Sequence, residues 1–197
     1  MLVKRKESTF MERRDGKNII FLVTAPSGAG KTHLVTCAVQ ELNAEKTIIQ
    51  RVRSFTTRNK RIGETDDAYD FQSIGWLIAQ KEADNIFEMN QLGDNFYGHT
   101  KSQLNETLRM THAINDVSEH AHQTFKDAGY EVRSILIVPK DTVLARDIEP
   151  ARARDDDARR EIHVPYDLIV ENHFRIGGAE QAVKTLVEYI RQFTLIE

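Results

Sequence analysis

The segment Ala25-Pro26-Ser27-Gly28-Ala29-Gly30-Lys31-Thr32 decides the fold of this 197-residue chain. An apolar run at 19–23 (IIFLV) precedes it, as in a buried strand, and residues 34–39 (LVTCAV) follow it with a helical pattern. A strand, a glycine-rich turn and Lys-Thr at a helix start form the arrangement that binds polyphosphate. Small residues let backbone N–H groups curl around an anion, and the helix N-terminus adds partial positive charge. The segment therefore predicts a nucleoside-triphosphate site.

Two side chains of this loop have defined roles at such a site. Lys31 reaches the outer phosphates, and the hydroxyl of Thr32 ligates the Mg²⁺ carried with ATP. A glycine turn without a ligand is the alternative, and the flanking strand and helix make it the less favoured one. The loop residues expected to bind ATP are Ala25, Ser27, Gly28, Ala29, Gly30, Lys31 and Thr32.

The composition, 40% apolar and 29% charged, is that of a globular protein without a membrane-spanning run. The single cysteine, Cys37, suits a reducing cytoplasm, and no secretory signal is recognisable, so we expect a cytoplasmic protein. Residues 1–17 hold six basic and three acidic residues, which leaves the remainder with a charge of −6. We interpret residues 1–17 as a basic, mobile arm. The acidic body argues against nonspecific binding of nucleic acid.

Strands and helices alternate along the chain, which predicts an α/β fold: a parallel P-loop sheet with helices on both faces. We expect strands at 47–52, 111–115, 132–138 (ended by Pro139) and 166–170, and helices at 101–110, 117–128 and after 177–178. Residues 54–100 differ, with four glycines, several aromatic residues, a short helix at 74–83 and a strand-like piece at 85–89. We interpret 54–100 as a small α+β insertion in a core made of 18–53 and 101–197.

Five further pieces follow the loop in order: residues 54–58 (SFTTR), 61–64 (RIGE), 69–71 (YDF), 87–88 (FE) and 95–98 (NFYG). Together with the loop they closely resemble the guanylate kinases, a family of P-loop nucleoside monophosphate kinases. The resemblance runs from about residue 19 to residue 193. It implies Mg²⁺-dependent phosphoryl transfer from ATP to GMP and dGMP. It also implies that 54–100 binds the monophosphate and that a short lid occupies about residues 146–160.

The residue types in these pieces suit such an acceptor. Arg58 and Arg61 offer planar forks that clamp a phosphate, and Tyr69 and Tyr97 can donate hydroxyl hydrogen bonds to it. Glu88 can accept from both N1–H and the exocyclic amine of guanine. Adenine presents no such donor pair, so a buried Glu88 facing AMP would be left unpaired.

Other roles come from the resemblance alone. Ser54 matches the family's guanine-contacting serine, and His99 stands where the family has Ser or Thr facing the carbonyl oxygen of the base. Asp116 is the retained acid of a two-acid motif whose other acid is Ile114 here, and it implies a base-side or metal-side contact. The remaining ATP contacts implied by the family are Arg154 of the lid and Asn172 near the adenine. Lys31, Arg154 and Arg58 are then the residues expected to act in catalysis.

Two alternatives stay open. One is a P-loop kinase for another nucleotide or a sugar phosphate, which His99 and the lost acid motivate. The other is a non-catalytic guanylate kinase-like interaction module, although such modules typically lose the phosphate-binding loop that stands intact here. The expected partners are small molecules, neither membrane nor nucleic acid, and the oligomeric state stays open. His120 and His122 are two apart on an expected helix and cannot chelate one metal together, so we expect no zinc site.

Overall fold

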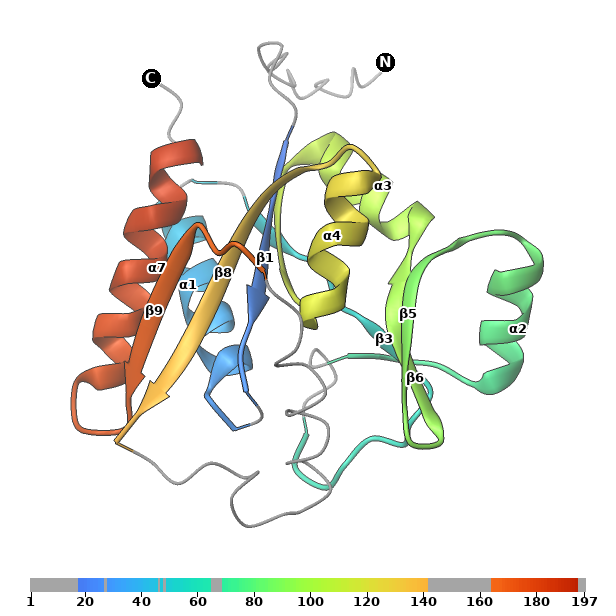
Figure 1. The fold of residues 1–197 in the computed structure, drawn as a ribbon, viewed down its shortest axis with the longest axis horizontal. Helices are drawn as coiled ribbons and strands as arrows, with labels where there is room; N and C mark the ends of the chain where they lie inside the picture. Colours follow the sequence, from blue (N-terminus) through green and yellow to red (C-terminus); the bar gives the residue numbers. More distant parts are fainter. Residues whose placement is uncertain are drawn as a thin grey trace, which may run out of the picture.

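The computed structural model describes residues 18–26, 28–45, 47, 49–64, 69–141 and 164–194. A parallel sheet of five strands forms its centre, in the order β2 (Ile49–Arg51), β7 (His112–Asp116), β1 (Ile19–Thr24), β8 (Glu131–Lys140) and β9 (Leu168–His173) (Figure 1). Because β1 lies in the middle of this order, both of its edges are hydrogen bonded, to β7 and to β8. The predicted α/β fold with a parallel sheet is confirmed.

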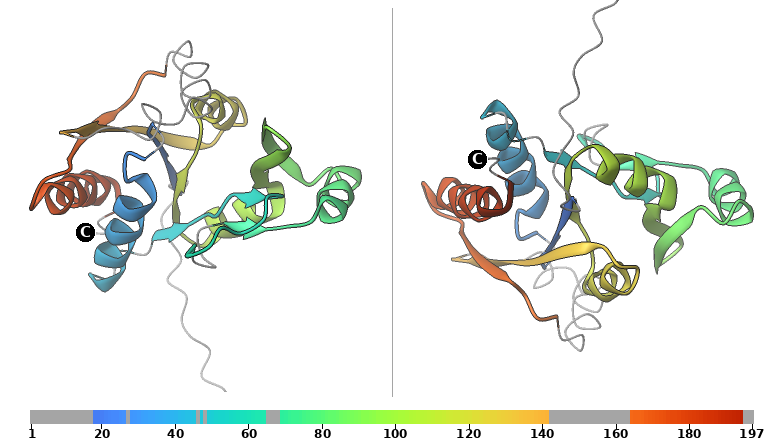
Figure 2. Two further views of the ribbon diagram at one scale, coloured as in Figure 1. Left: turned by 90° about the horizontal axis from the view of Figure 1, so that it is seen from below. Right: turned by 90° about the horizontal axis from the view of Figure 1, so that it is seen from above.

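All six residues of β1 are buried, and their side chains alternate between two apolar cores. Phe21 and Val23 face α1 (Lys31–Ala44) and α7 (Gly178–Thr194), whereas Ile20 and Leu22 face α3 (Lys101–Met110) and α4 (Glu119–Asp127). Figure 2 shows these helices in pairs on opposite sides of the sheet. A strand covered on both faces reads as a continuous apolar run, which explains the sequence at 19–23.

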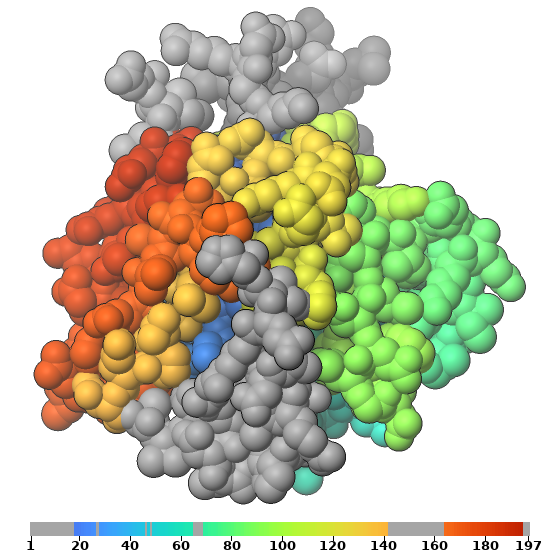
Figure 3. Space-filling model, in the orientation of Figure 1, coloured from blue at the N-terminus to red at the C-terminus, as the bar shows by residue number. Residues whose placement is uncertain are grey.

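A second, smaller sheet lies beside the first. Its order is β4 (Asp70–Phe71), β3 (Phe55–Thr56), β6 (Asn95–Thr100) and β5 (Ile86–Leu92), and it has both parallel and antiparallel pairs. The helix α2 (Ile74–Glu82) belongs to the same part of the chain, and the space-filling view shows α2, β5 and β6 in green as a lobe beside the body (Figure 3). Gly98 allows β5 to approach β6, because a Cβ there would lie 2.2 Å from the Glu88 carbonyl oxygen.

Pro139 does not end its strand as the sequence suggested, since β8 continues to Lys140 and pairs with β9 from Ile135 to Lys140. The carbonyl oxygens of Ser134 and Lys140 both accept from the β9 side, so the nitrogen of Pro139 points the other way. On that side β1 has already ended, opposite Leu136. The missing N–H of proline therefore removes no ladder hydrogen bond.

The structure contains no helix, among the residues it describes, that is long and apolar enough to cross a membrane. The expected lid and the N-terminal arm lie outside the described residues.

Phe125→Ala should lower the free energy of unfolding by about 3–5 kcal/mol, because it leaves a cavity in the core beneath the small sheet. Phe125 is fully buried and packs edge-on against Phe87 of β5 at a centroid distance of 4.7 Å. Urea denaturation followed by circular dichroism measures the loss. Phe174→Ala is the control because Phe174 is 47% exposed, and equal losses in the two variants would contradict the packing described here.

Candidate active site

The phosphate-binding loop joins the carboxyl end of β1 to the start of α1. Gly28 and Gly30 both have positive φ, 83° and 82°, and the amide of Ala29 donates to the carbonyl oxygen of Pro26 at 3.1 Å. This turn encloses a cavity of about 320 Å³ at the N-terminus of α1, where backbone N–H groups and the helix dipole favour an anion. The cavity is lined by Ala25, Pro26, Gly28, Ala29, Gly30, Lys31, Thr32 and His33. Ser27 lies outside the described residues.

Asn172 supports the loop from β9. Its Nδ2 donates to the carbonyl oxygen of Ala29 at 2.9 Å, and a Cβ at Gly30 would lie 2.8 Å from the same nitrogen. Gly30 is thus required both for its backbone conformation and for the close approach of Asn172. Asn172 is buried, and its Oδ1 has no hydrogen-bond partner within the described part of the chain.

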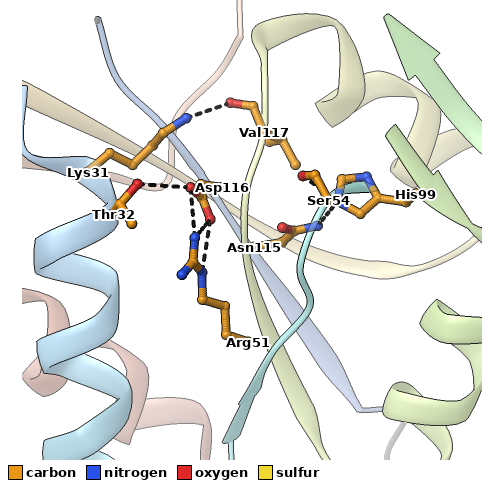
Figure 4. A network of polar contacts seen from close by, with 8 residues as sticks. All are labelled: Lys31, Thr32, Arg51, Ser54, His99, Asn115, Asp116 and Val117. Atoms are coloured by element: carbon orange, nitrogen blue, oxygen red, sulfur yellow. Dashed lines mark hydrogen bonds and ion pairs between the residues drawn. The ribbon is translucent and has the colours of Figure 1, made fainter. Parts of the chain in front are cut away.

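The carboxylate of Asp116 lies between the loop and the end of β2 (Figure 4). It accepts from the hydroxyl of Thr32 at 3.4 Å and from Arg51, whose Nη2 is 2.9 Å and whose Nε is 3.2 Å from Oδ1. Beside it, Lys31 Nζ donates to the carbonyl oxygen of Val117 at 3.5 Å. Two strands, β2 and β7, and the loop therefore converge on one buried charge.

Two opposing effects set the pKa of Asp116. Burial alone would raise the pKa, but the charges of Lys31 and Arg51 outweigh it and hold the pKa below its ordinary value. Asp116 is therefore ionised at neutral pH. Its carboxylate and the hydroxyl of Thr32 are hard oxygen donors of the kind that Mg²⁺ prefers, so these two side chains could hold that ion.

Arg51 was missed in the sequence analysis. Its only signal is a charged residue at the carboxyl end of a short predicted strand, which in a parallel sheet is the edge where the phosphate-binding loop also lies. The register decides the contact, since Arg51 pairs with Ile114 and thus stands two positions from Asp116 along the neighbouring strand.

A second cavity, of about 360 Å³, opens between the two sheets and reaches the loop at Lys31. It brings together six residues expected from the sequence to bind the acceptor, and they come from the second lobe and from β7. The cavity is lined by Lys31, Ser54, Tyr69, Glu88, Asn90, Gln91, Leu92, Tyr97, Gly98, His99, Asp116, Val117, Ser118 and His120.

The sequence model of the guanylate kinase family matches residues 16–192. The chain belongs to the guanylate kinase family. It is 31% identical over 166 residues to the guanylate kinase of Hahella chejuensis, an alignment that covers 78% of each chain. It is also 31% identical over 177 residues to that of Pseudomonas syringae pv. tomato, covering 87% of this chain and 78% of the relative.

The fold agrees with this family assignment. The crystal structure of guanylate kinase from Anaplasma phagocytophilum superimposes with a TM-score of 0.65 and 19% sequence identity, covering 91% of this chain and 88% of that one. At this identity the match concerns the fold: a five-stranded parallel sheet with a separate small mixed sheet.

Arg58, expected from the guanylate kinase resemblance to clamp a phosphate, is held by Glu64. Its Nη1 lies 2.7 Å from Glu64 Oε2, and its guanidinium lies 5.1 Å from the ring centroid of Tyr69. The hydrogen bond from Arg58 lowers the pKa of Glu64 to about 2.

Arg61 has an exposed side chain, and its backbone N–H donates to Glu64. Glu64 was read only as part of a motif, and its partner could not be inferred from sequence. Arg154 lies outside the described residues.

His99 lines the cavity, but its side chain is buried between the two sheets. Its side chain is 2% exposed and contacts Glu88 from β5, Ser54, and Asn115 from β7. In this guanylate kinase family member the ring therefore joins two expected guanine contacts, Ser54 and Glu88, to the main sheet.

The two histidines of α4 lie in different surroundings, as their spacing indicated. His120 is exposed, whereas His122 is buried between Thr24, at 2.7 Å, and Ser134, at 2.9 Å. Burial, together with the charges of Lys126 and Lys31, lowers the pKa of His122 to about 4. Within the described ranges, no group of three or more His, Cys, Asp or Glu side chains is arranged to hold a metal ion.

His122→Gln should make stability less dependent on pH between about 6.5 and 4. The unfolded chain protonates His122 near its ordinary pKa of about 6.5, while the folded chain resists protonation down to about 4, so acidification costs the wild type up to about 3 kcal/mol there. Glutamine takes up no proton, so the free energy of unfolding of the variant should fall less on acidification than that of the wild type. Urea denaturation at a series of pH values measures this, with His120→Gln as control. Parallel curves for wild type and His122→Gln would contradict the assignment.

Proposed function

We propose that this chain transfers the terminal phosphoryl group of ATP to GMP and dGMP, giving ADP and the nucleoside diphosphate. One observation carries the proposal: a single cavity is lined both by Lys31 of the phosphate-binding loop and by the carboxylate of Glu88. The Glu88 side chain is only 10% exposed. Guanine offers N1–H and an exocyclic amine as a donor pair for such a carboxylate. AMP has neither N1–H nor a 2-amino group, so it would not supply the donor pair that Glu88 accepts from guanine, which costs affinity.

On the donor side, the loop amides and Lys31 bind the ATP phosphates and neutralise their charge. Mg²⁺ carried with ATP would be held by Thr32 and Asp116 and would neutralise phosphate charge. Asn172, whose Oδ1 has no partner among the described residues, is proposed to meet the adenine. Arg154 is proposed to contact the transferred group.

On the acceptor side, positioning matters more than general-base catalysis. The second pKa of a phosphate monoester is about 6, so the acceptor is largely a dianion at neutral pH and needs little deprotonation. Tyr69 and Tyr97 line the cavity and can donate to this phosphate, with Arg58 and Arg61 as its cationic clamp. The rate enhancement then comes from alignment and charge neutralisation.

One observation favours a different acceptor for the same kinase chemistry. His99 fills the position where the family has a small hydroxyl residue, so a different nucleotide or a sugar phosphate is the second candidate. Glu88 opposes a bare sugar phosphate, which would leave its carboxylate unused. A non-catalytic module is the third candidate, and the intact Gly30-Lys31-Thr32 opposes it.

An acceptor screen with Mg-ATP tests the proposal by measuring ADP release with GMP, dGMP, AMP, CMP, UMP and ribose 5-phosphate. GMP and dGMP should give the highest kcat/KM. Faster turnover of an acceptor without guanine would overturn the assignment. Absence of ATP binding in calorimetry would instead favour the interaction module.

Lys31→Ala should reduce kcat for phosphoryl transfer by at least about a hundredfold, because the charge that stabilises the transferred group is lost. The fold should persist, since α1 begins at Lys31 and its buried face starts at Leu34. Steady-state kinetics with GMP and thermal unfolding measure both. Lys184→Ala on the exposed face of α7 is the matched control. Near-normal turnover by Lys31→Ala would contradict the scheme.

Glu88→Ala should lower kcat/KM for GMP by about a hundredfold, because hydrogen bonds to a charged group contribute about 1.5–3 kcal/mol each. The KM for ATP should change little, since Glu88 lines the acceptor cavity and not the loop cavity. The comparison variant is Glu106→Ala, at an exposed position of α3. An unchanged kcat/KM for GMP would remove Glu88 from base recognition.

A further inference from the structure

The imidazole of His99 makes a hydrogen bond to an expected guanine contact from each of its two nitrogens. Nδ1 lies 2.5 Å from Glu88 Oε1. Nε2 lies 2.9 Å from Ser54 Oγ and 2.6 Å from Asn115 Nδ2. The ring is also edge-on to Phe125, at a centroid distance of 6.0 Å, so its plane is restrained as well.

These partners determine where the proton of His99 lies. A carboxylate can only accept, so Nδ1 carries the hydrogen that it donates to Glu88. With the amide of Asn115 oriented so that Nδ2 faces the ring, Nε2 accepts from it. The hydroxyl of Ser54 shares the single lone pair of Nε2 with Asn115 in a bifurcated contact, which leaves the lone pairs of Ser54 Oγ available.

The backbone brings Glu88 and His99 together. They are directly opposite each other on the antiparallel strands β5 and β6, so their side chains lie on the same face of the small sheet. Asn115 comes from β7 of the main sheet and therefore ties this pair to the body of the protein.

We infer that His99 is a specificity-determining positioning residue, which holds Glu88 and Ser54 as one unit for reading a purine base. This inference rests on the proposed function. Because both ring nitrogens are already bonded within the protein, His99 has no donor left for the carbonyl oxygen of the base. Acceptor choice therefore depends on the donor pair that Glu88 reads, N1–H and the 2-amino group, and on how firmly His99 orients that carboxylate.

Two substitutions at position 99 test the contacts of Nδ1 and of Nε2 separately. The amide of His99→Asn reaches about as far as Nδ1 and can still donate to Glu88. The amide of His99→Gln reaches about as far as Nε2, so it retains the contacts to Ser54 and Asn115 but loses the one to Glu88. The pair differs by one methylene group, and each variant is the control for the other.

The experiment measures kcat and KM for GMP, IMP and ATP in the wild type and both variants. IMP is the probe because it has N1–H but lacks the 2-amino group. His99→Gln should raise the KM for GMP by about tenfold and reduce the preference for GMP over IMP by a similar factor, with the KM for ATP unchanged. His99→Asn should keep the KM for GMP and the preference for GMP over IMP close to those of the wild type. Equal behaviour of the two variants, or a parallel rise in the KM for ATP, would overturn the inference and leave GMP kinase activity standing.

A nitrogen NMR measurement on the histidine-labelled wild type keeps the test independent of catalysis and of variant folding. The His99 ring should carry its proton on Nδ1 and none on Nε2, and its Nδ1 signal should shift in Glu88→Gln. A proton on Nε2 alone, or no response to Glu88→Gln, would overturn the inference. If the wild type fails to phosphorylate GMP, the proposed function fails, and these signals still decide whether His99 orients Glu88.

Discussion

Burial of β1 on both faces is the constraint on which the rest of the structure depends. Its alternating side chains enter two different cores, and both of its edges are hydrogen bonded, so the strand has a single register. The loop at its carboxyl end is fixed by the same constraint. Parallel neighbours end at the same edge of the sheet, so β7 and β9 deliver Asp116 and Asn172 to the loop.

Two carboxylates with little exposure organise the cavities at this edge, and each is paired within the protein. Asp116 meets Lys31 and Arg51, and the two cations offset the cost of removing its charge from water. Glu88 meets His99, which is itself bonded to Asn115 of the main sheet. Asp116 ties the loop to β2, and His99, the partner of Glu88, ties the small sheet to β7. Packing and charge thus hold the two halves of the site in one arrangement.

Much of the fold followed from local patterns. The apolar run at 19–23, the glycine-rich loop and the helix at 101–110 lie where the sequence indicated, because periodicity and turn chemistry act over a few residues. The end of β8 could not be predicted from the local pattern. A strand tolerates proline only where the edge that its nitrogen faces has no neighbour, and the tertiary structure decides which edge that is. The cavity between the two sheets gathers six residues that their types and the family resemblance had grouped in the sequence analysis: Ser54, Tyr69, Glu88, Tyr97, His99 and Asp116.

The sequence by itself determined the fold class, the phosphate-binding loop and membership in a kinase family, since these are written in contiguous residues and their order. Only the tertiary structure decided which charges meet. Arg51 and Asp116 are 65 residues apart, and His99 and Asn115 belong to different sheets. Such pairs form through strand register and the approach of two sheets, and side-chain hydrogen bonds require contact within about 3 Å. No local pattern encodes a distance of that kind.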